Sequence, residues 1–185
     1  MHHIDLSSVL RQTVACDLYS NLVTRPTGAA VRDQIERLLD EAHDRTLTVI
    51  DFSQVSMIDF SCADEVIAKL LLRYEAANPP REAYFLFRGV TDEHWEAIEA
   101  VLERRGLALV LEQADGIHVV GTLTAEERRV WEAVQQLGAA APAELAKQLG
   151  LDPRAIEAAL DTLLRRRLVM HVGDDYVVVG AHRGG

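Results

Sequence analysis

Cysteine is scarce in this chain, which carries only Cys16 and Cys62 among its 185 residues. Two isolated cysteines supply neither a disulfide framework nor the paired spacing of a structural zinc site. The seven histidines are scattered as well, without an H-E-x-x-H pattern, so the sequence predicts no metal site. His2 and His3 stand at the N-terminus, where we expect a disordered end.

Long apolar runs and phosphate-binding glycine loops are also missing. No run reaches the roughly 18 apolar residues of a membrane span, and the first residues lack the apolar stretch of a secretory signal. Neither G-x-G-x-x-G nor G-x-x-x-x-G-K-S/T occurs. These absences predict a cytoplasmic protein with no cofactor and no membrane partner.

Basic residues are in the minority. The chain has 19 Lys and Arg against 29 Asp and Glu, a formal net charge of −10. Up to Gly121 there are 11 basic and 20 acidic residues, a net charge of −9, and after it there are 8 and 9, a net charge of −1. An acidic surface repels phosphates and therefore opposes general binding of nucleic acid. It is compatible with protein partners.

Strand-like and helix-like segments alternate through the first 121 residues. Apolar residues recur at helix spacing in 31–43 and 63–74, and again between Thr91, a plausible N-cap, and Gly106. Strand-like runs are found at residues 47–52, 84–90, 107–113 and 116–121. The alternation predicts an α/β sheet with packed helices. Residues 1–24 fit a strand or a helix equally well, and Trp95 and Trp131 take helix-interior positions, as core or interface residues do.

The sequence after Gly121 has a different pattern of helix and turn signals. Thr124 and Glu127 have the spacing of a capping box that opens a helix, and Pro142 and Pro153 suit the first turns of two more. A hairpin signal at 173–175 follows. Three helices and a hairpin in this order resemble the winged helix-turn-helix. We therefore expect an α/β domain at 1–121 and a small α+β winged-helix domain at 122–185.

The winged-helix resemblance implies that the third helix could enter the major groove of DNA. The candidate DNA contacts are Arg154, Thr162, Arg165, Arg166 and Arg167. Glu157 and Asp161 on the same helix oppose an approach to phosphates. Protein contact or homodimerisation through this domain remains an equal alternative to DNA binding.

The stretch SMIDFSCADE, residues 56–65, joins a strand-like run to a helix-like run. From chemistry alone, Ser61-x-x-Asp64 has the form of a capping box, so the simplest interpretation is a well-capped helix start. Cys62 is not expected to be a thiol nucleophile, because no histidine is near in sequence and the neighbouring carboxylates should raise the pKa of its thiol. It is expected to be a small buried residue of the helix.

The run TLTVIDFSQVSMIDFSCADEVIAKLL resembles the strand, loop and helix of STAS domains, the fold of anti-sigma-factor antagonists. The pattern is carried by Ile58, Asp59, Phe60 and Ser61, with Cys62 in place of the family's glycine. The acidic pair Asp64-Glu65 and the upstream TRPTG (24–28) are similar to looser relatives that lack the glycine. The resemblance implies that residues 1–121 form a STAS-like α/β domain. It also implies a role in partner switching that regulates transcription.

In that family the serine that matches Ser61 is phosphorylated by a partner kinase that is also the anti-sigma factor. The resemblance therefore makes Ser61 a candidate phospho-acceptor, with Asp59 positioning its hydroxyl group. Asp64 and Glu65, expected in the first turn of the helix, would repel a phosphate there. They oppose phosphorylation more than partner binding.

These observations predict a non-enzymatic regulator that docks a protein partner, plausibly an anti-sigma-type ATP-binding kinase, through the loop and helix at 56–72. The candidate partner-binding residues are Ser56, Asp59, Phe60, Ser61, Cys62, Asp64 and Glu65. The winged helix would be a second interaction module. The alternatives are a DNA-binding transcriptional regulator with an N-terminal sensor domain, and an enzyme that uses Asp59, Asp64 and Glu65, whose spacing does not require them to converge.

Overall fold

A computed structural model describes residues 2–5, 21–42 and 45–181 of the chain. The elements up to Gly121 are β1 (His2–Asp5), β2 (Asn21–Leu22), α2 (Arg25–Glu41), β3 (Thr46–Asp51), β4 (Met57–Ile58), α3 (Phe60–Ala63), the π-helical turn η1 (Asp64–Ala68), α4 (Lys69–Glu75), β5 (Ala83–Arg88), α5 (Asp92–Arg105), β6 (Ala108–Gln113) and β7 (Gly116–Gly121). The C-terminal part, residues 122–181, contains α6 (Ala125–Leu137), α7 (Pro142–Leu149), α8 (Pro153–Arg165), β8 (Val169–Val172) and β9 (Asp175–Val178). The chain is thus a mixed α/β protein, and no helix in the described ranges is long and apolar enough to cross a membrane.

Five strands form the main sheet, in the order β1-β3-β5-β6-β7. The first four are parallel and β7 is antiparallel to β6. His2 and His3 pair with Thr48 and Val49 in this sheet, so the expectation that they are disordered was wrong. Of the ambiguous residues 1–24, residues 2–5 and 21–22 are strands, and residues 6–20, with Cys16, lie outside the described part.

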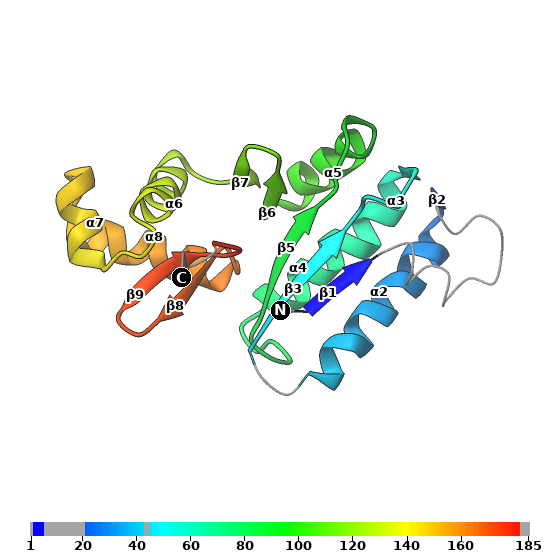
Figure 1. The fold of residues 1–185 in the computed structure, drawn as a ribbon, viewed down its shortest axis with the longest axis horizontal. Coiled ribbons are helices and arrows are strands. Elements are labelled where there is room, and N and C mark those ends of the chain that lie inside the picture. Colours follow the sequence, from blue (N-terminus) through cyan, green and yellow to red (C-terminus); the bar gives the residue numbers. More distant parts are fainter. Residues whose placement is uncertain (1, 6–20, 43–44, 182–185) are drawn as a thin grey trace.

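The strand order explains where the helices lie. Along the chain, each new parallel strand is added at the same edge of the sheet. Right-handed crossovers that all run in this one direction place their helices on one face of the sheet. Figure 1 shows α2, α4 and α5 on that side of the sheet. Alternate strand residues Ile50, Phe85, Phe87, Leu109 and Leu111 point to these helices and form the first apolar cluster with them.

The opposite face of the sheet is equally apolar and is covered by the C-terminal part (Figure 1). Tyr84, Leu86 and Val110 pack in a second cluster with Val130 and Trp131 of α6, among other residues. The predicted boundary coincides with the end of β7 at Gly121, yet residues on both sides of it share this one cluster.

The two tryptophans differ in their burial. Trp131 is buried, and its indole N–H donates to the Leu168 carbonyl at 3.1 Å. Trp95 is half-buried against the first cluster. The predicted core or interface position of Trp131 is confirmed, and Trp95 lies at the margin of the core.

Polar contacts also join the two parts. Arg45 donates to the His171 carbonyl at 2.9 Å, and Arg166 donates to the Gly106 carbonyl at 3.1 Å. Arg167 donates to the Tyr74 carbonyl at 3.1 Å. A carboxylate oxygen of the neighbouring Glu75 is buried without a hydrogen-bond partner. Burial raises the pKa of Glu75 to about 7 against the opposing pull of Arg165, Arg166 and Arg167.

The fit between the two parts can be tested at Gly180. Its φ is +84°, and a Cβ placed there would lie 2.9 Å from a Leu86 methyl group of the sheet. Gly173 has a similar φ of +63° but open space around it. We expect Gly180→Ala to lower the free energy of unfolding by about 1–3 kcal/mol more than Gly173→Ala, because only the first adds overpacking to backbone strain. Equal losses in urea denaturation would contradict the tight contact.

A second test uses the buried carboxyl of Glu75. Its folded pKa of about 7 exceeds the ordinary glutamate pKa of 4.5, so ionising it destabilises the folded state as pH rises between these values. We expect Glu75→Gln to stabilise the protein by about 1–3 kcal/mol at about pH 8 and to have little effect near pH 4. Denaturant unfolding at both pH values measures this, with Glu126→Gln on the exposed side of α6 as a control that should show no such pH dependence.

Candidate functional site

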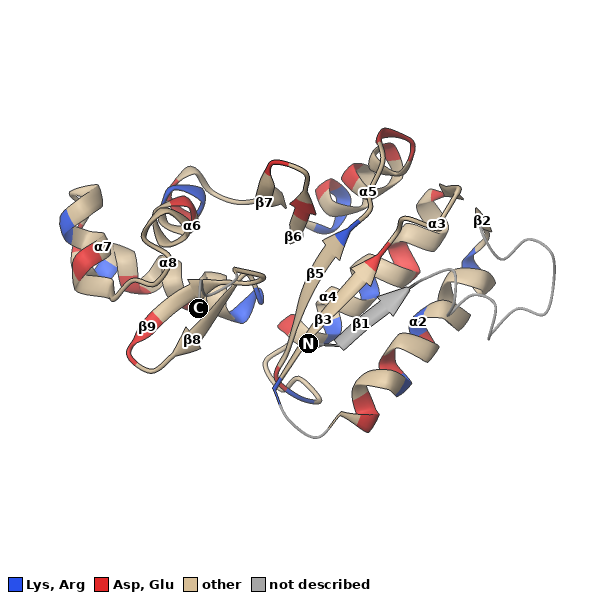
Figure 2. Ribbon diagram, in the orientation of Figure 1, with Lys and Arg blue, Asp and Glu red and all other residues tan. Residues whose placement is uncertain are grey.

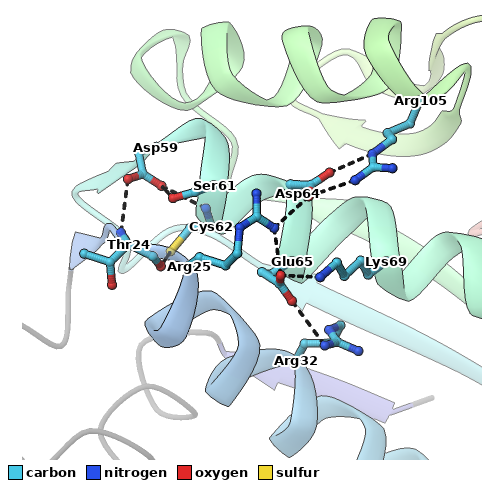
Figure 3. A network of polar contacts seen from close by, with 10 residues as sticks. All are labelled: Thr24, Arg25, Arg32, Asp59, Ser61, Cys62, Asp64, Glu65, Lys69 and Arg105. Atoms are coloured by element: carbon cyan, nitrogen blue, oxygen red, sulfur yellow. Dashed lines mark hydrogen bonds and ion pairs between the residues drawn. The ribbon is translucent and has the colours of Figure 1, made fainter.

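Two segments that are distant in sequence meet at one end of the molecule. β2 pairs in parallel with β4, so Leu22 lies opposite Ile58, and α2 and α3 begin side by side. Gly28 permits this approach, since a Cβ there would lie 2.9 Å from the Cys62 Cα and the Glu65 Cβ. TRPTG and SCADE therefore form one site, drawn in Figure 3.

Asp59 caps the start of α3. Its carboxylate accepts hydrogen bonds from the Ser61 hydroxyl at 2.9 Å and from the backbone N–H groups of Cys62 at 2.8 Å and Thr24 at 3.1 Å (Figure 3). Desolvation raises the pKa of Asp59, but these three donors outweigh it and lower the pKa below its usual value. The cap of this helix is Asp59, which corrects the interpretation of Ser61 and Asp64 as a capping box.

Thr24 is held in a strained backbone conformation at the same point. Its φ is +76°, a region that a β-branched residue rarely adopts. The backbone N–H of Thr24 donates to Asp59, and its carbonyl accepts from the Cys62 thiol at 2.8 Å. Strain of this kind persists only where the surroundings over-determine it and is concentrated at functional sites.

Cys62 itself is an unreactive residue. Its side chain is fully buried, and burial together with the nearby Asp59 charge raises the pKa of the thiol to about 12. The thiol stays protonated at neutral pH and serves as a hydrogen-bond donor. The expected small buried residue is confirmed.

Asp64 and Glu65 form a buried ionic cluster between α2, η1 and α5. Arg25 bridges the two, at 2.9 Å from the Asp64 carboxylate and 2.8 Å from that of Glu65. Arg105 adds two hydrogen bonds to Asp64, at 2.8 and 3.0 Å. Glu65 also accepts from Arg32 at 3.1 Å and from Lys69 (Figure 3).

The electrostatics of this cluster favour both carboxylates as anions. Hydrogen bonds from Arg105, together with those from Arg25, outweigh desolvation and lower the pKa of Asp64. Desolvation is the largest influence on Glu65, but Lys69 and Arg25 offset it and lower its pKa as well. Each acid is only 2% exposed. They are therefore internal ion pairs and not, as expected, free charges at the helix start.

The π-helical turn explains the geometry of these acids. The sequence predicts one continuous helix at 63–74, but the chain takes a wider turn at Asp64–Ala68, between α3 and α4. Single π turns inside helices are frequent at functional sites. Both Asp64 and Glu65 lie in this turn, and their carboxylates form ion pairs with arginines of α2 and α5.

The predicted partner-binding residues divide into two groups. Ser56 is exposed, and Asp59, Phe60 and Ser61 are half-buried and accessible. Cys62, Asp64 and Glu65 are buried, so the prediction that they contact a partner is corrected.

Sequence reasoning missed other residues of this surface. Met57 is 50% exposed, more than Leu72 at 41% and Leu137 at 36%, the other exposed large apolar side chains of the described residues. A groove of about 310 Å³ between α3 and α5 is lined by Ile58, which follows Met57 in β4, and by Asp59, Phe60, Glu93, Glu96, Ala97 and Ala100. Glu93 and Glu96 lie 3 apart on α5 and are both exposed, which the helix period of that segment could have indicated.

The predicted DNA contacts are only partly available. Arg154 and Arg165 are exposed on α8, and Thr162 is half-buried. Arg166 donates to the backbone carbonyls of Gly106 and Thr122 and Arg167 to that of Tyr74, so their assignment as DNA contacts is corrected. Figure 2 shows acidic residues distributed over the helices of both parts.

Comparison of the chain with protein-family models, with curated proteins and with solved structures found no match. The described residues contain no group of three or more His, Cys, Asp or Glu side chains that could hold a metal ion. The function is therefore argued from the site itself.

The ionic cluster predicts a pH-dependent contribution to stability. Because the pKa of Asp64 is lowered on folding, its stabilisation is complete above the unfolded pKa of about 4 and is lost as pH falls through the lower folded value. We expect Asp64→Asn to cost about 2 kcal/mol at neutral pH, less than a fully buried pair, since Arg25 and Arg105 reach solvent. The difference from wild type should shrink below about pH 4 in urea titrations.

The exposed Asp33 on α2 offers a matched control. Asp33→Asn makes the same chemical change outside the cluster and should alter the unfolding free energy by less than about 0.5 kcal/mol. A loss for Asp64→Asn no larger than for Asp33→Asn would show that the cluster does not stabilise the site.

Proposed function

We propose that this protein is a non-enzymatic regulator that docks a protein partner on the surface formed by Ser56, Met57, Asp59, Phe60 and Ser61, hereafter the docking surface. In this proposal the sheet part is a STAS-like domain and residues 122–185 are a winged helix-turn-helix domain. The element order supports both assignments: alternating strands and helices first, then α6, α7, α8 and the β8–β9 hairpin. The chemistry of the docking surface carries the function.

The observation that carries the proposal is a groove lined by carboxylates, with the exposed Met57 next in the chain to its lining residue Ile58. A half-exposed apolar side chain next to this polar lining offers a partner an apolar contact. Asp59, Glu93 and Glu96 line the groove. Phe60 also lines the groove, with the Arg104 guanidinium 5.4 Å from its ring. This arrangement suits a partner segment that presents an apolar anchor flanked by basic residues.

Rigid support beneath the docking surface favours recognition over catalysis. The Asp59 hydrogen bonds and the Asp64–Glu65 ion pairs tie α2, α3 and α5 together directly below it. A preorganised surface loses less conformational entropy on association. The same carboxylates are saturated with donors, which suits a scaffold better than a general acid or base.

The partner we propose is an ATP-binding kinase of the anti-sigma type, and Ser61 is the candidate phospho-acceptor. Its hydroxyl hydrogen-bonds to Asp59 and is accessible at the margin of the docking surface. A phosphate there would add roughly −1.5 to −2 charges beside the Asp59 carboxylate. Repulsion between them would disturb the docking surface and release the partner.

The docking surface can be tested with matched variants. Met57→Asp places a charge on it, and Leu72→Asp makes the same change at another exposed apolar residue, 41% exposed on α4. We expect Met57→Asp to reduce recovery of the natural partner in affinity capture by at least about tenfold, as loss of an interface anchor does, while Leu72→Asp recovers it fully. Mass spectrometry of the captured protein identifies whether it has an ATP-binding kinase fold.

Circular dichroism and unfolding curves must first show that both variants are folded. Equal recovery with wild type, Met57→Asp and Leu72→Asp would remove the docking surface from the account. Capture of a protein without a nucleotide-binding domain, sensitive to Met57→Asp, would keep the docking surface and reject the kinase.

A further inference from the structure

A second site lies away from the docking surface, where the sheet and the C-terminal part meet. A cavity of about 540 Å³ opens there, within the size range of small-molecule sites. Its polar lining comes from Arg45, Arg81, Glu82, Arg167 and His171. Three guanidinium groups and one carboxylate thus face a single cavity in a chain whose net charge is −10.

The hydrogen bonds of these arginines do not compensate their charge, although Arg45 also forms an ion pair with Glu82. Arg45 donates to the His171 carbonyl, Arg167 to the Tyr74 carbonyl, and Arg81 to the carbonyls of Asp40 and Ala42. These acceptors are neutral. The one carboxylate among the lining residues, Glu82, is 3.7 Å from Arg45 and accepts the Tyr84 hydroxyl at 2.6 Å. The positive charge of the lining therefore exceeds its negative charge.

Arg167 occupies a backbone position that normally suits glycine. It follows the C-cap of α8 with a φ of +61°, and its N–H and that of Leu168 bond back to Leu164 and Leu163 at 3.0 and 2.9 Å. This is the Schellman arrangement, in which glycine avoids the steric cost of a side chain. The Arg167 side chain instead extends to the cavity, where its guanidinium lies 5.5 Å from the Tyr84 ring centre. Backbone outliers of this kind are concentrated at active sites and ligand clamps.

We propose that this cavity binds a small anion that bears phosphate groups, such as a pyrophosphate or the phosphate moiety of a nucleotide. Guanidinium groups match phosphate oxygens in charge and in hydrogen-bonding geometry. The Tyr84 ring is fully buried, so it offers no face for a base to stack on and recognition rests on the phosphates. Because Arg45 and Arg81 belong to the sheet part and Arg167 and His171 to the C-terminal part, the anion would hold the two parts together.

Calorimetric titration of the full chain with pyrophosphate tests this proposal. Wild type should bind one equivalent and gain thermal stability in proportion to its occupancy. Glu82→Gln removes the one lining carboxylate and should tighten binding several-fold, by relief of like-charge repulsion. Arg167→Gln should weaken it by about tenfold or more, as for a lost charge-assisted contact.

Arg154→Gln, at an exposed arginine of α8, is the control for a change in overall charge and should leave binding within about twofold of wild type. If Arg167→Gln does not fold, Glu82→Gln decides, because a merely structural role for these arginines predicts no tightening. The absence of both binding heat and thermal stabilisation at about 10 mM pyrophosphate, a concentration far above the dissociation constant of a useful site, would overturn the proposal. So would binding that neither variant changes, or tighter binding of a phosphoserine peptide than of pyrophosphate.

Discussion

An apolar sheet face that no crossover helix can reach governs the architecture of this protein. The strand order β1-β3-β5-β6-β7 sends all the crossovers to one side. The alternation of side chains along β5 and β6 nevertheless places Tyr84, Leu86 and Val110 on the other side. Burial of that face against α6, α8 and the β8–β9 hairpin makes the C-terminal part a layer of one structure. In the same layer, Arg166 and Arg167 donate hydrogen bonds to backbone carbonyls of this chain.

The two candidate binding sites differ in their chemistry. At one end, the starts of α2 and α3 are locked by Asp59 and by the buried Asp64–Glu65 cluster, beneath a surface with apolar and acidic character. At the junction of the two parts, arginines surround a cavity. Contacts at the first site suit a basic and apolar protein segment, and those at the second suit a phosphate-bearing anion. As the binding sites that we propose, they would suit a regulator that responds both to a protein partner and to a small anion.

Much of the fold follows from local pattern, and much of the site does not. Apolar periodicity located the principal helices and strands, and Thr124 with Glu127 marked a real capping box. Acidic residues that follow a helix start give the same sequence pattern whether their side chains are exposed or buried. The burial of Asp64 depends on Arg25 and Arg105, about 40 residues away in either direction. Neither the π turn nor the β2–β4 pairing that joins TRPTG to SCADE has a local signal.

The claim that the C-terminal part is an integral layer of the structure can be tested most directly by native-state hydrogen exchange. If the apolar face of the sheet requires its cover, the slowest amides of β5 and α8 should open with the same free energy, in one global unfolding reaction. Exchange of the α6–α8 amides at clearly lower free energy, while β5 remains protected, would show that the sheet stands without this layer. That result would contradict the account.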